Sequence, residues 1–275
     1  MTDASVADRR AAPRETPERR SVTREPFVEF RDVHKAYGVK QVLRGASVKV
    51  YRGEVLVILG GSGTGKSVTL RHMLGLEHPD RGSVFVEDED ITELPEEELY
   101  RVRKKFGMLF QSGALFDSMN VFENVAFPLR EHTDMKDEEI SRAVREKLEL
   151  VNLPGTEHLM PVDLSGGMRK RVGLARSIVL DPKVILYDEP TTGLDPITAQ
   201  KINELIVDLQ TKLSVTSVVV THDIQSAFSV GDRIAFLNQG VFEWVGTMDD
   251  ARDAAHPQLR DFLKASSVVA AQPTR

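Results

Sequence analysis

The chain has 275 residues, 41% of them hydrophobic and 28% charged, which is typical of a globular protein with a substantial buried core. Its net charge of −6 argues against a general affinity for nucleic acid, and the absence of cysteine excludes disulfides and thiolate metal sites. No apolar stretch reaches the ~20 residues needed to span a bilayer, so we expect any role at a membrane to depend on a partner chain.

The N-terminal segment is rich in Arg, Glu, Ala and Pro and carries almost no large apolar side chains. We expect residues 1–24 to form a disordered tail, with a docking arm as the alternative. Charges at Asp3 and Asp8, and the lack of an apolar segment after them, do not fit a secretion signal. One folded domain is predicted over residues 25–264, followed by a second disordered tail over residues 265–275.

Strand patterns begin at Phe27–Phe30 and Ala46–Val50. Three short apolar runs follow, each typical of a strand buried on both faces of a parallel sheet. They are Val55–Leu59, Val184–Tyr187 and Ser217–Val220. Helical patterns lie between these runs, and this alternation predicts an α/β fold.

A helical insertion is predicted between the first and second apolar runs, over about residues 112–162. A charged, periodic segment there places Ile140, Val144 and Leu148 on one helix face. Pro154 and the glycine after it end the pattern.

A phosphate-binding loop is predicted directly after the run Val55–Leu59. Its residues are Gly60, Gly61, Ser62, Gly63, Thr64, Gly65, Lys66 and Ser67, followed by Val68 in an apolar helical pattern. Glycines let backbone N–H groups curl around phosphate oxygens, and the helix that follows points its positive end at the same anion. We expect Lys66 to neutralise the β and γ phosphates and the Ser67 hydroxyl to bind Mg²⁺. The alternative is a glycine-rich turn without a ligand.

Two carboxylates, Asp188 and Glu189, end the second apolar run. The carboxyl ends of parallel strands are where α/β sheets bind ligands. We expect Asp188 to hold Mg²⁺ and Glu189 to orient or deprotonate an attacking water. The alternative is a solvated junction between strand and loop.

A third motif is Leu164-Ser165-Gly166-Gly167-Met168. Ser165 is a good N-cap for the helix that follows, and its Ser-Gly-Gly backbone is predicted to bind phosphate. Arg169, Lys170 and Arg171 then occupy the first turn, where the helix dipole disfavours cations. Either an anionic partner or nearby Asp and Glu side chains would offset that cost.

Taken together, these motifs resemble those of ABC ATPases, and the resemblance covers residues 27–246. Four further residues match motifs of that family. Tyr37 resembles the aromatic residue that stacks on adenine, and Gln111 resembles the glutamine that touches Mg²⁺. Asp195 corresponds to the end of the D-loop, and His222 resembles the switch histidine at the γ phosphate.

The resemblance implies a RecA-like P-loop ATPase core with an antiparallel β subdomain and an inserted α-helical subdomain. It implies ATP and Mg²⁺ as cofactors, with Glu189, His222 and Gln111 in catalysis. ABC ATPases act as head-to-tail pairs, so a homodimer is expected in which Ser165, Gly166 and Gly167 of one copy meet the phosphate held by Lys66 of the other.

One cassette without a membrane span resembles the separate ATPase subunit of a transporter with permease subunits in other chains. Met168 departs from the family's usual glutamine, which puts any contact of that side chain in doubt. Several segments resemble the ATPases of MCE/Mla-type lipid transporters: Phe110–Met119, Val121–Leu129, Leu164–Arg171, Asp188–Pro196 and His256–Leu263.

This resemblance implies a peripheral location on the cytoplasmic face of a bacterial inner membrane. It also implies an MCE-domain protein, and a small regulatory subunit is a further candidate partner. The side chains around Leu115, Phe116, Val121 and Phe122 are candidates to receive a coupling helix of the permease, or else to pack the helical subdomain.

Two alternatives remain open at this stage. The chain could serve a transporter of amino acids, metals or lipoproteins, because the cargo does not touch this subunit. It could also be a soluble ABC protein of DNA repair or translation. Tandem cassettes and long coiled coils typical of those proteins are absent from the sequence, and the acidic charge argues against nucleic acid.

Overall fold

The computed structural model describes residues 25–270, and side chains only to residue 265. The predicted tail over 1–24 lies outside the described residues. Helix α9 (Pro257–Ala270) extends beyond residue 264, where the sequence predicts the end of the folded domain. Leu259 is fully buried and the Phe262 ring lies 5.5 Å from that of Phe236, so the first turns of α9 are anchored to the core. Within residues 25–270, no helix combines the length and apolarity that crossing a bilayer requires.

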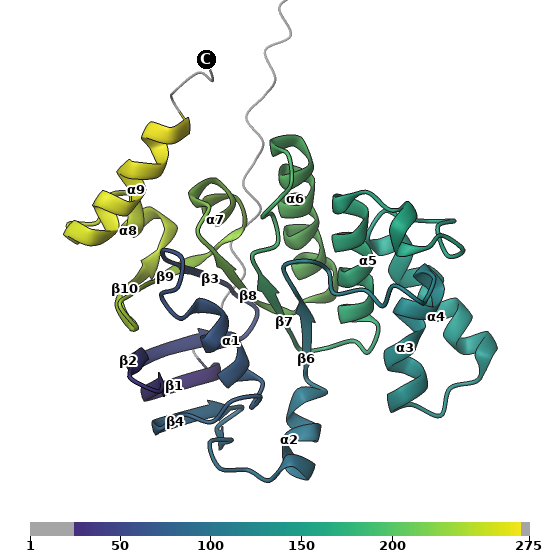
Figure 1. The fold of residues 1–275 in the computed structure, drawn as a ribbon, viewed down its shortest axis with the longest axis horizontal. Helices are drawn as coiled ribbons and strands as arrows, with labels where there is room; N and C mark the ends of the chain where they lie inside the picture. The colour runs from purple at the N-terminus through teal and green to yellow at the C-terminus, as the bar shows by residue number, and fades with distance from the viewer. Residues whose placement is uncertain (1–24, 271–275) are drawn as a thin grey trace, which may run out of the picture.

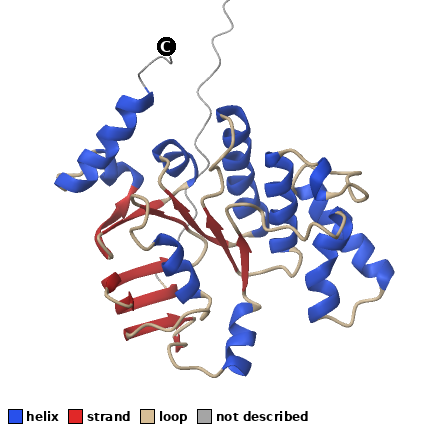
Figure 2. Cartoon of the chain, in the orientation of Figure 1, coloured by secondary structure: helices blue, strands red, loops and turns tan. Residues whose placement is uncertain are grey.

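An antiparallel sheet of four strands forms one layer of the molecule (Figures 1 and 2). Its order is β2 (Lys40–Tyr51), β1 (Pro26–Tyr37), β4 (Arg81–Val86) and β5 (Glu89–Asp90). Strands β1 and β2 are longer than the sequence pattern predicts, because they form a hairpin around Gly38, whose φ of 60° suits glycine.

A six-stranded sheet forms the centre of the molecule, with the order β10-β9-β3-β8-β7-β6. The strands are β3 (Val55–Leu59), β6 (Phe106–Leu109), β7 (Val184–Asp188), β8 (Thr216–Thr221), β9 (Arg233–Asn238) and β10 (Val241–Thr247). All neighbouring pairs are parallel except β9 with β10. The three predicted apolar runs are the adjacent strands β3, β8 and β7, which confirms the α/β prediction.

Alternate residues of the central strands face two different cores. Val57 and Tyr187 face a core built with α5 (Gly166–Ile178), α6 (Pro196–Leu213) and α7 (Ile224–Val230). Leu56 and Leu186 face the antiparallel sheet together with α1 (Lys66–Met73) and α2 (Glu96–Arg103). Because both sheet faces are covered, the strands read as continuous apolar runs in the sequence. The short helix α8 (Met248–Arg252) follows β10.

The helical region lies at one side of the molecule (Figure 1). It contains α3 (Val121–His132), α4 (Asp137–Leu150) and the 3₁₀ turn Pro161–Asp163, all within or next to the range 112–162. A capping box between Asn120 and Glu123 begins α3. The predicted apolar face of α4 is buried, and α3 and α4 pack against each other and against α5.

Candidate active site

Four loops meet at one edge of the central sheet because they follow four adjacent parallel strands. The phosphate loop follows β3 and His222 follows β8. Asp188 is the last residue of β7 and Glu189 comes directly after it, and Gln111 comes after β6. The strands are in direct register, with Leu59 opposite Thr221 and Leu109 opposite Tyr187. The fold therefore brings together segments that are far apart in the sequence.

The phosphate loop needs its glycines for both conformation and space. Gly63 and Gly65 have φ values of 74° and 107°, in the region that favours glycine. A Cβ atom on Gly60 would lie 2.3 Å from the carbonyl oxygen of Leu237. The loop leads directly into α1, so the first backbone N–H groups of this helix point into the loop. Val68 is half-buried on the core beneath α1.

Lys66 lies folded back over this loop. Its ammonium group donates hydrogen bonds of 3.0 Å to the carbonyl oxygens of Gly60 and Gly61, and its side chain is only 7% exposed. A buried ammonium group at the start of α1, together with the free N–H groups of the first helical turn, favours an anion at this loop.

Ser67 and Asp188 present a pair of oxygen ligands beside the loop. The Ser67 hydroxyl donates a 3.0 Å hydrogen bond to Asp188, and burial raises the pKa of that carboxyl group. Hard oxygen donors of this kind suit Mg²⁺, which usually completes its shell with water and phosphate oxygens. Among the described residues, no cluster of three His, Asp or Glu side chains forms a ready-made metal site. The two oxygen donors of Ser67 and Asp188 suit a Mg²⁺ ion whose other ligands are water and phosphate oxygens.

Glu189 is fixed from several directions. Its backbone has a φ of 49°, a strained value for a non-glycine residue, and its N–H donates to Val220. One carboxylate oxygen lies 3.4 Å from the Lys66 ammonium, and the other lies 2.9 Å from Nδ1 of His222. Thr192 donates a further hydrogen bond of 3.1 Å to it. The structure thus joins Lys66, Glu189 and His222 in one cluster.

Tyr37 lies at the end of β1, near α1. Its hydroxyl group bonds to Glu77, which also pairs with Arg71 of α1 at 3.0 Å. Burial and the Glu77 carboxylate raise the pKa of Tyr37 to about 12, so the phenol stays protonated. The side chain is held at its tip while 44% of the residue is exposed, which leaves a ring surface for stacking.

The Leu-Ser-Gly-Gly motif forms the start of α5 as predicted. The Ser165 hydroxyl accepts a 3.2 Å hydrogen bond from the Met168 N–H, which confirms the N-cap. A Cβ atom on Gly167 would lie 2.5 Å from the side chain of Thr198 on α6. Glycine at this position therefore permits close packing of α5 on α6.

The three cations of the first turn donate hydrogen bonds to backbone carbonyls of the same chain. Arg169 donates to Leu164, and Arg171 donates to Asn152. Lys170 donates to the carbonyls of Glu189 (3.3 Å), Pro190 (2.6 Å) and Thr192 (2.8 Å), and burial lowers its pKa to about 8. These contacts of Lys170 could not be predicted from the sequence, because carbonyl acceptors carry no residue-specific signal.

Gln111 and Asp195 lie at the edges of this cluster. Gln111 is exposed, two residues beyond the end of β6 at the shared sheet edge. The Asp195 carboxylate caps α6 by accepting hydrogen bonds from the N–H groups of Ile197 and Thr198, at 3.1 and 3.0 Å. Its observed contacts are therefore those of a helix cap.

The chain is similar to known proteins over most of its length. The ABC transporter family profile matches residues 43–192. "Probable ribonucleotide transport ATP-binding protein mkl" of Mycobacterium tuberculosis is 44% identical over 88% of this chain and 67% of the relative. "Intermembrane phospholipid transport system ATP-binding protein MlaF" of Escherichia coli is 42% identical over 86% of this chain and 88% of the relative.

Solved structures show the same fold. "Dimeric structure of a post-hydrolysis state of the ATP-binding cassette MJ0796 bound to ADP and Pi" matches 80% of this chain and 98% of that chain, with a TM-score of 0.74 and 33% identity. CbiO1 of Clostridium perfringens, described as part of the ABC transporter complex cbiONQ, matches with a TM-score of 0.75 and 26% identity over 87% of this chain and 99% of that chain. The chain belongs to the ABC transporter family and is one of its ATP-binding, ATP-hydrolysing cassettes.

Proposed function

We propose that the cluster of Lys66, Glu189 and His222 is the hydrolytic centre of this cassette, and that it drives lipid transport. The contact of Glu189 with both Lys66 and His222 carries this proposal. It places a carboxylate beside the lysine that would hold the γ phosphate, where it can orient or deprotonate the attacking water. His222 would contact the same phosphate.

Mg²⁺ would be held by Ser67 and Asp188, with Gln111 nearby on the adjacent strand end. The ion would neutralise charge on the phosphates during transfer. Backbone N–H groups from Gly60 to Ser67 would surround the phosphates, and Tyr37 would stack on adenine.

A homodimer would complete the site. Helix α1 packs against β7 and β8, whereas α5 packs against β6, α3, α4 and α6, and the two helices lie on different sides of β6 and β7 in Figure 1. Ser165, Gly166 and Gly167 would therefore serve a phosphate held by a second copy of the chain. The dimeric form named for the MJ0796 cassette supports this arrangement.

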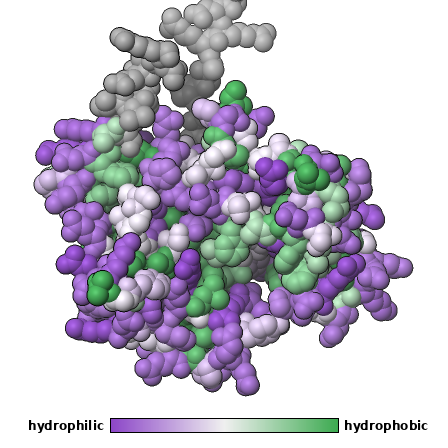
Figure 3. Space-filling model, in the orientation of Figure 1, coloured by the Kyte–Doolittle hydropathy of each residue, from purple (hydrophilic) through white to green (hydrophobic). Residues whose placement is uncertain are grey.

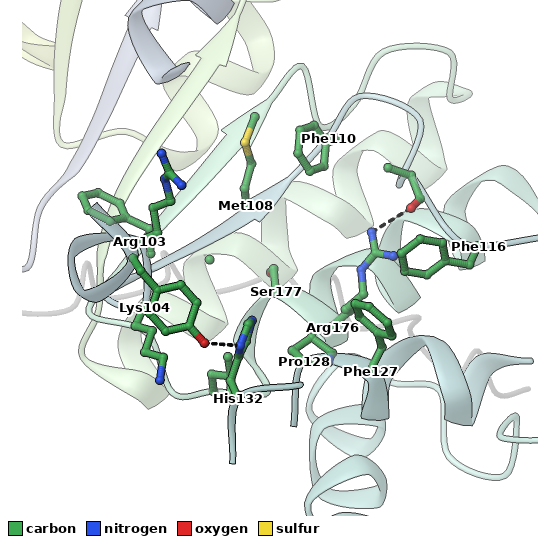
Figure 4. A pocket seen from close by; sticks show the side chains of 15 residues that line it. Arg103, Lys104, Met108, Phe110, Phe116, Phe127, Pro128, His132, Arg176 and Ser177 are labelled. Atoms are coloured by element: carbon green, nitrogen blue, oxygen red, sulfur yellow. Dashed lines mark hydrogen bonds between the residues drawn. The ribbon is translucent and has the colours of Figure 1, made fainter. Parts of the chain in front are cut away.

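A groove between α2, β6, α3 and α5 is the candidate docking surface for a permease subunit. Its volume is about 500 Å³, and its lining includes the aromatic side chains of Tyr100, Phe106, Phe110, Phe116 and Phe127, with Arg103, Lys104 and Arg176 among them (Figure 4). Figure 3 shows apolar residues around a hollow on this side of the molecule. Exposed aromatic and cationic side chains together favour an apolar helix with acidic residues.

Of the four side chains that were candidates to receive a coupling helix, one lines this groove. Phe116 lines it and is 42% exposed. Val121 is fully buried, and Leu115 and Phe122 pack against the core of the helical region.

Lipid is the cargo that the relatives favour, because the name of MlaF specifies intermembrane phospholipid transport. Ribonucleotide transport, in the name of mkl, is the second candidate. An MCE-domain protein and a small regulatory subunit would be further partners, with the assembly on the cytoplasmic face of an inner membrane.

Affinity purification of the tagged chain from detergent-solubilised membranes tests this proposal. We expect a permease, an MCE-domain protein and co-purifying phospholipid. A permease with a soluble solute-binding protein and no lipid would contradict the lipid assignment and leave the hydrolytic centre untouched.

A further inference from the structure

A buried hydroxyl on α7 joins three segments around the candidate active site. Ser226 is 1% exposed and donates a 2.7 Å hydrogen bond to the Asp223 carboxylate. It accepts a 2.9 Å hydrogen bond from the Asn203 amide and lies 3.1 Å from the Thr191 hydroxyl. Because a serine has one proton, which goes to Asp223, Thr191 must be the donor in the last contact.

Each partner of Ser226 belongs to a segment of the site. Thr191 lies two residues after Glu189, and Asn203 lies on α6, the helix that Asp195 caps. Asp223 follows His222 directly and also caps α7, because its other oxygen accepts from the Gln225 N–H at 3.0 Å. Thr191 and Asn203 are 6% and 7% exposed, so little water is available to replace these bonds.

His222 depends on this network for its position. The side chain of His222 is 57% exposed, and a 2.9 Å hydrogen bond to Glu189 links it to the rest of the site. Its backbone lies between β8 and Asp223, whose carboxylate is held by Ser226. A shift of α7 relative to α6 would therefore move the imidazole relative to Glu189.

We propose that Ser226 is a positioning residue that couples the segment 191–195 and helix α6 to His222. This inference rests on the proposed hydrolytic centre and extends it. Within one chain, Leu194 lies 3.5 Å from where a Cβ of Gly166 would lie, and the proposed dimer brings Gly166 to the phosphate of the second copy. A change at the dimer interface would thus reach His222 through Thr191, Asn203 and Ser226.

The test compares Ser226→Ala with Ser229→Ala. Ser229 lies on the same helix but is exposed, and its hydroxyl bonds only to the carbonyl of Gln225. We expect Ser226→Ala to lower kcat about tenfold with less than a twofold change in ATP affinity, whereas Ser229→Ala matches the wild type. The His222 ring signals in ¹H–¹³C NMR spectra should shift in the first variant only.

A second pair of variants keeps the test decisive if Ser226→Ala does not fold. Thr191→Val keeps the side-chain shape but loses the donor, whereas Thr191→Ser keeps the donor. We expect kcat to fall in the valine variant and to be largely retained in the serine variant. Equal kcat values in Thr191→Val and Thr191→Ser would overturn the inference. So would a variant that unfolds at a lower temperature but leaves the NMR signal of His222 unchanged, because the network would then only stabilise the fold.

Failure of the inference is distinguishable from failure of the proposed centre. If the wild type hydrolyses ATP and Ser226→Ala and Thr191→Val are equally active, the coupling is rejected and the proposed hydrolytic centre is retained. If Glu189→Gln hydrolyses ATP normally, the centre itself is wrongly assigned, and the coupling to it falls as well.

Discussion

The ammonium nitrogen of Lys66 lies 3.4 Å from a carboxylate oxygen of Glu189, although the two residues belong to distant parts of the sequence. The side chains of both are largely buried, at 7% and 13% exposure. A phosphate bound in the loop would compete with Glu189 for the lysine. Nucleotide binding would thus free the carboxylate to approach water at the moment that the γ phosphate reaches the site.

Glu189→Gln should retain ATP binding but lose turnover by at least ~100-fold, because the amide cannot act as a base. ATP should then hold the variant as a closed dimer, which size-exclusion chromatography in the presence of ATP and Mg²⁺ would detect. The control is Glu204→Gln, since Glu204 is exposed on α6 and bonds only to Gln200. Near-normal turnover in Glu189→Gln would remove Glu189 from the hydrolytic role.

Two inactive variants should complement each other if the sites are shared between copies. Lys66→Ala removes the loop lysine, and Ser165→Arg blocks the start of α5. A mixed dimer contains one intact site, made by Lys66 of the second variant and Ser165 of the first. Equal mixing should restore about a quarter of wild-type turnover, because half the dimers are mixed and each has one working site. No recovery after mixing would show that Lys66 and Ser165 of the same chain serve one ATP.

Lys170 should make both the free energy of unfolding and the turnover of the enzyme depend on pH near pH 8. Burial lowers its pKa from 10.5 to about 8, so between these values the unfolded chain holds a proton that the folded chain has lost. The contribution of Lys170 to the free energy of unfolding therefore rises with pH across this window, and the cost of its buried charge is fully present below pH 8.

Turnover should change in the opposite direction. A neutral amine has two N–H donors for the three carbonyls of Glu189, Pro190 and Thr192, so the loop that carries Glu189 loosens above pH 8. The ratio of turnover in Lys170→Arg to that in the wild type should rise above pH 8, since a guanidinium stays charged. Lys183→Arg, an exposed site paired with Glu87, is the control. Parallel pH profiles for Lys170→Arg and the wild type would contradict this prediction.

A mutation in the groove should impair permease binding without lowering ATP hydrolysis by the isolated chain. Phe116→Asp places a charge among the apolar side chains of the groove and should abolish co-purification of the permease. The isolated chain should retain its basal ATPase, because the Phe116 ring packs on Phe127 and Arg176 beside the groove. Val207→Asp introduces the same charge at an exposed position of α6 and should leave co-purification intact. Unchanged permease binding by Phe116→Asp would exclude the groove as the docking surface.

Local sequence predicted those features whose interactions are themselves local. Val55–Leu59 matches β3 at both ends because the glycine loop directly follows it, and Ser165 caps its own helix. The short strands β6 and β9 were not predicted. Strand β6 has only four residues and is interrupted by Gly107, so its pairing with β7 determines its conformation more than its own pattern does. Strand β9 contains the buried apolar run Ile234–Leu237, a signal of the same kind as the three predicted runs that could have identified it.

By itself, the sequence determined the family, the phosphate loop and the residue types of the site, because contiguous motifs carry this information. Tertiary structure alone decided how Lys66, Glu189 and His222 meet, what Lys170 binds, and which hydroxyl connects α6 with α7. These contacts join residues far apart in the chain, and several use backbone carbonyls, which every residue possesses. Only the packing of parallel strands and their helices selects which of these groups come within hydrogen-bonding distance.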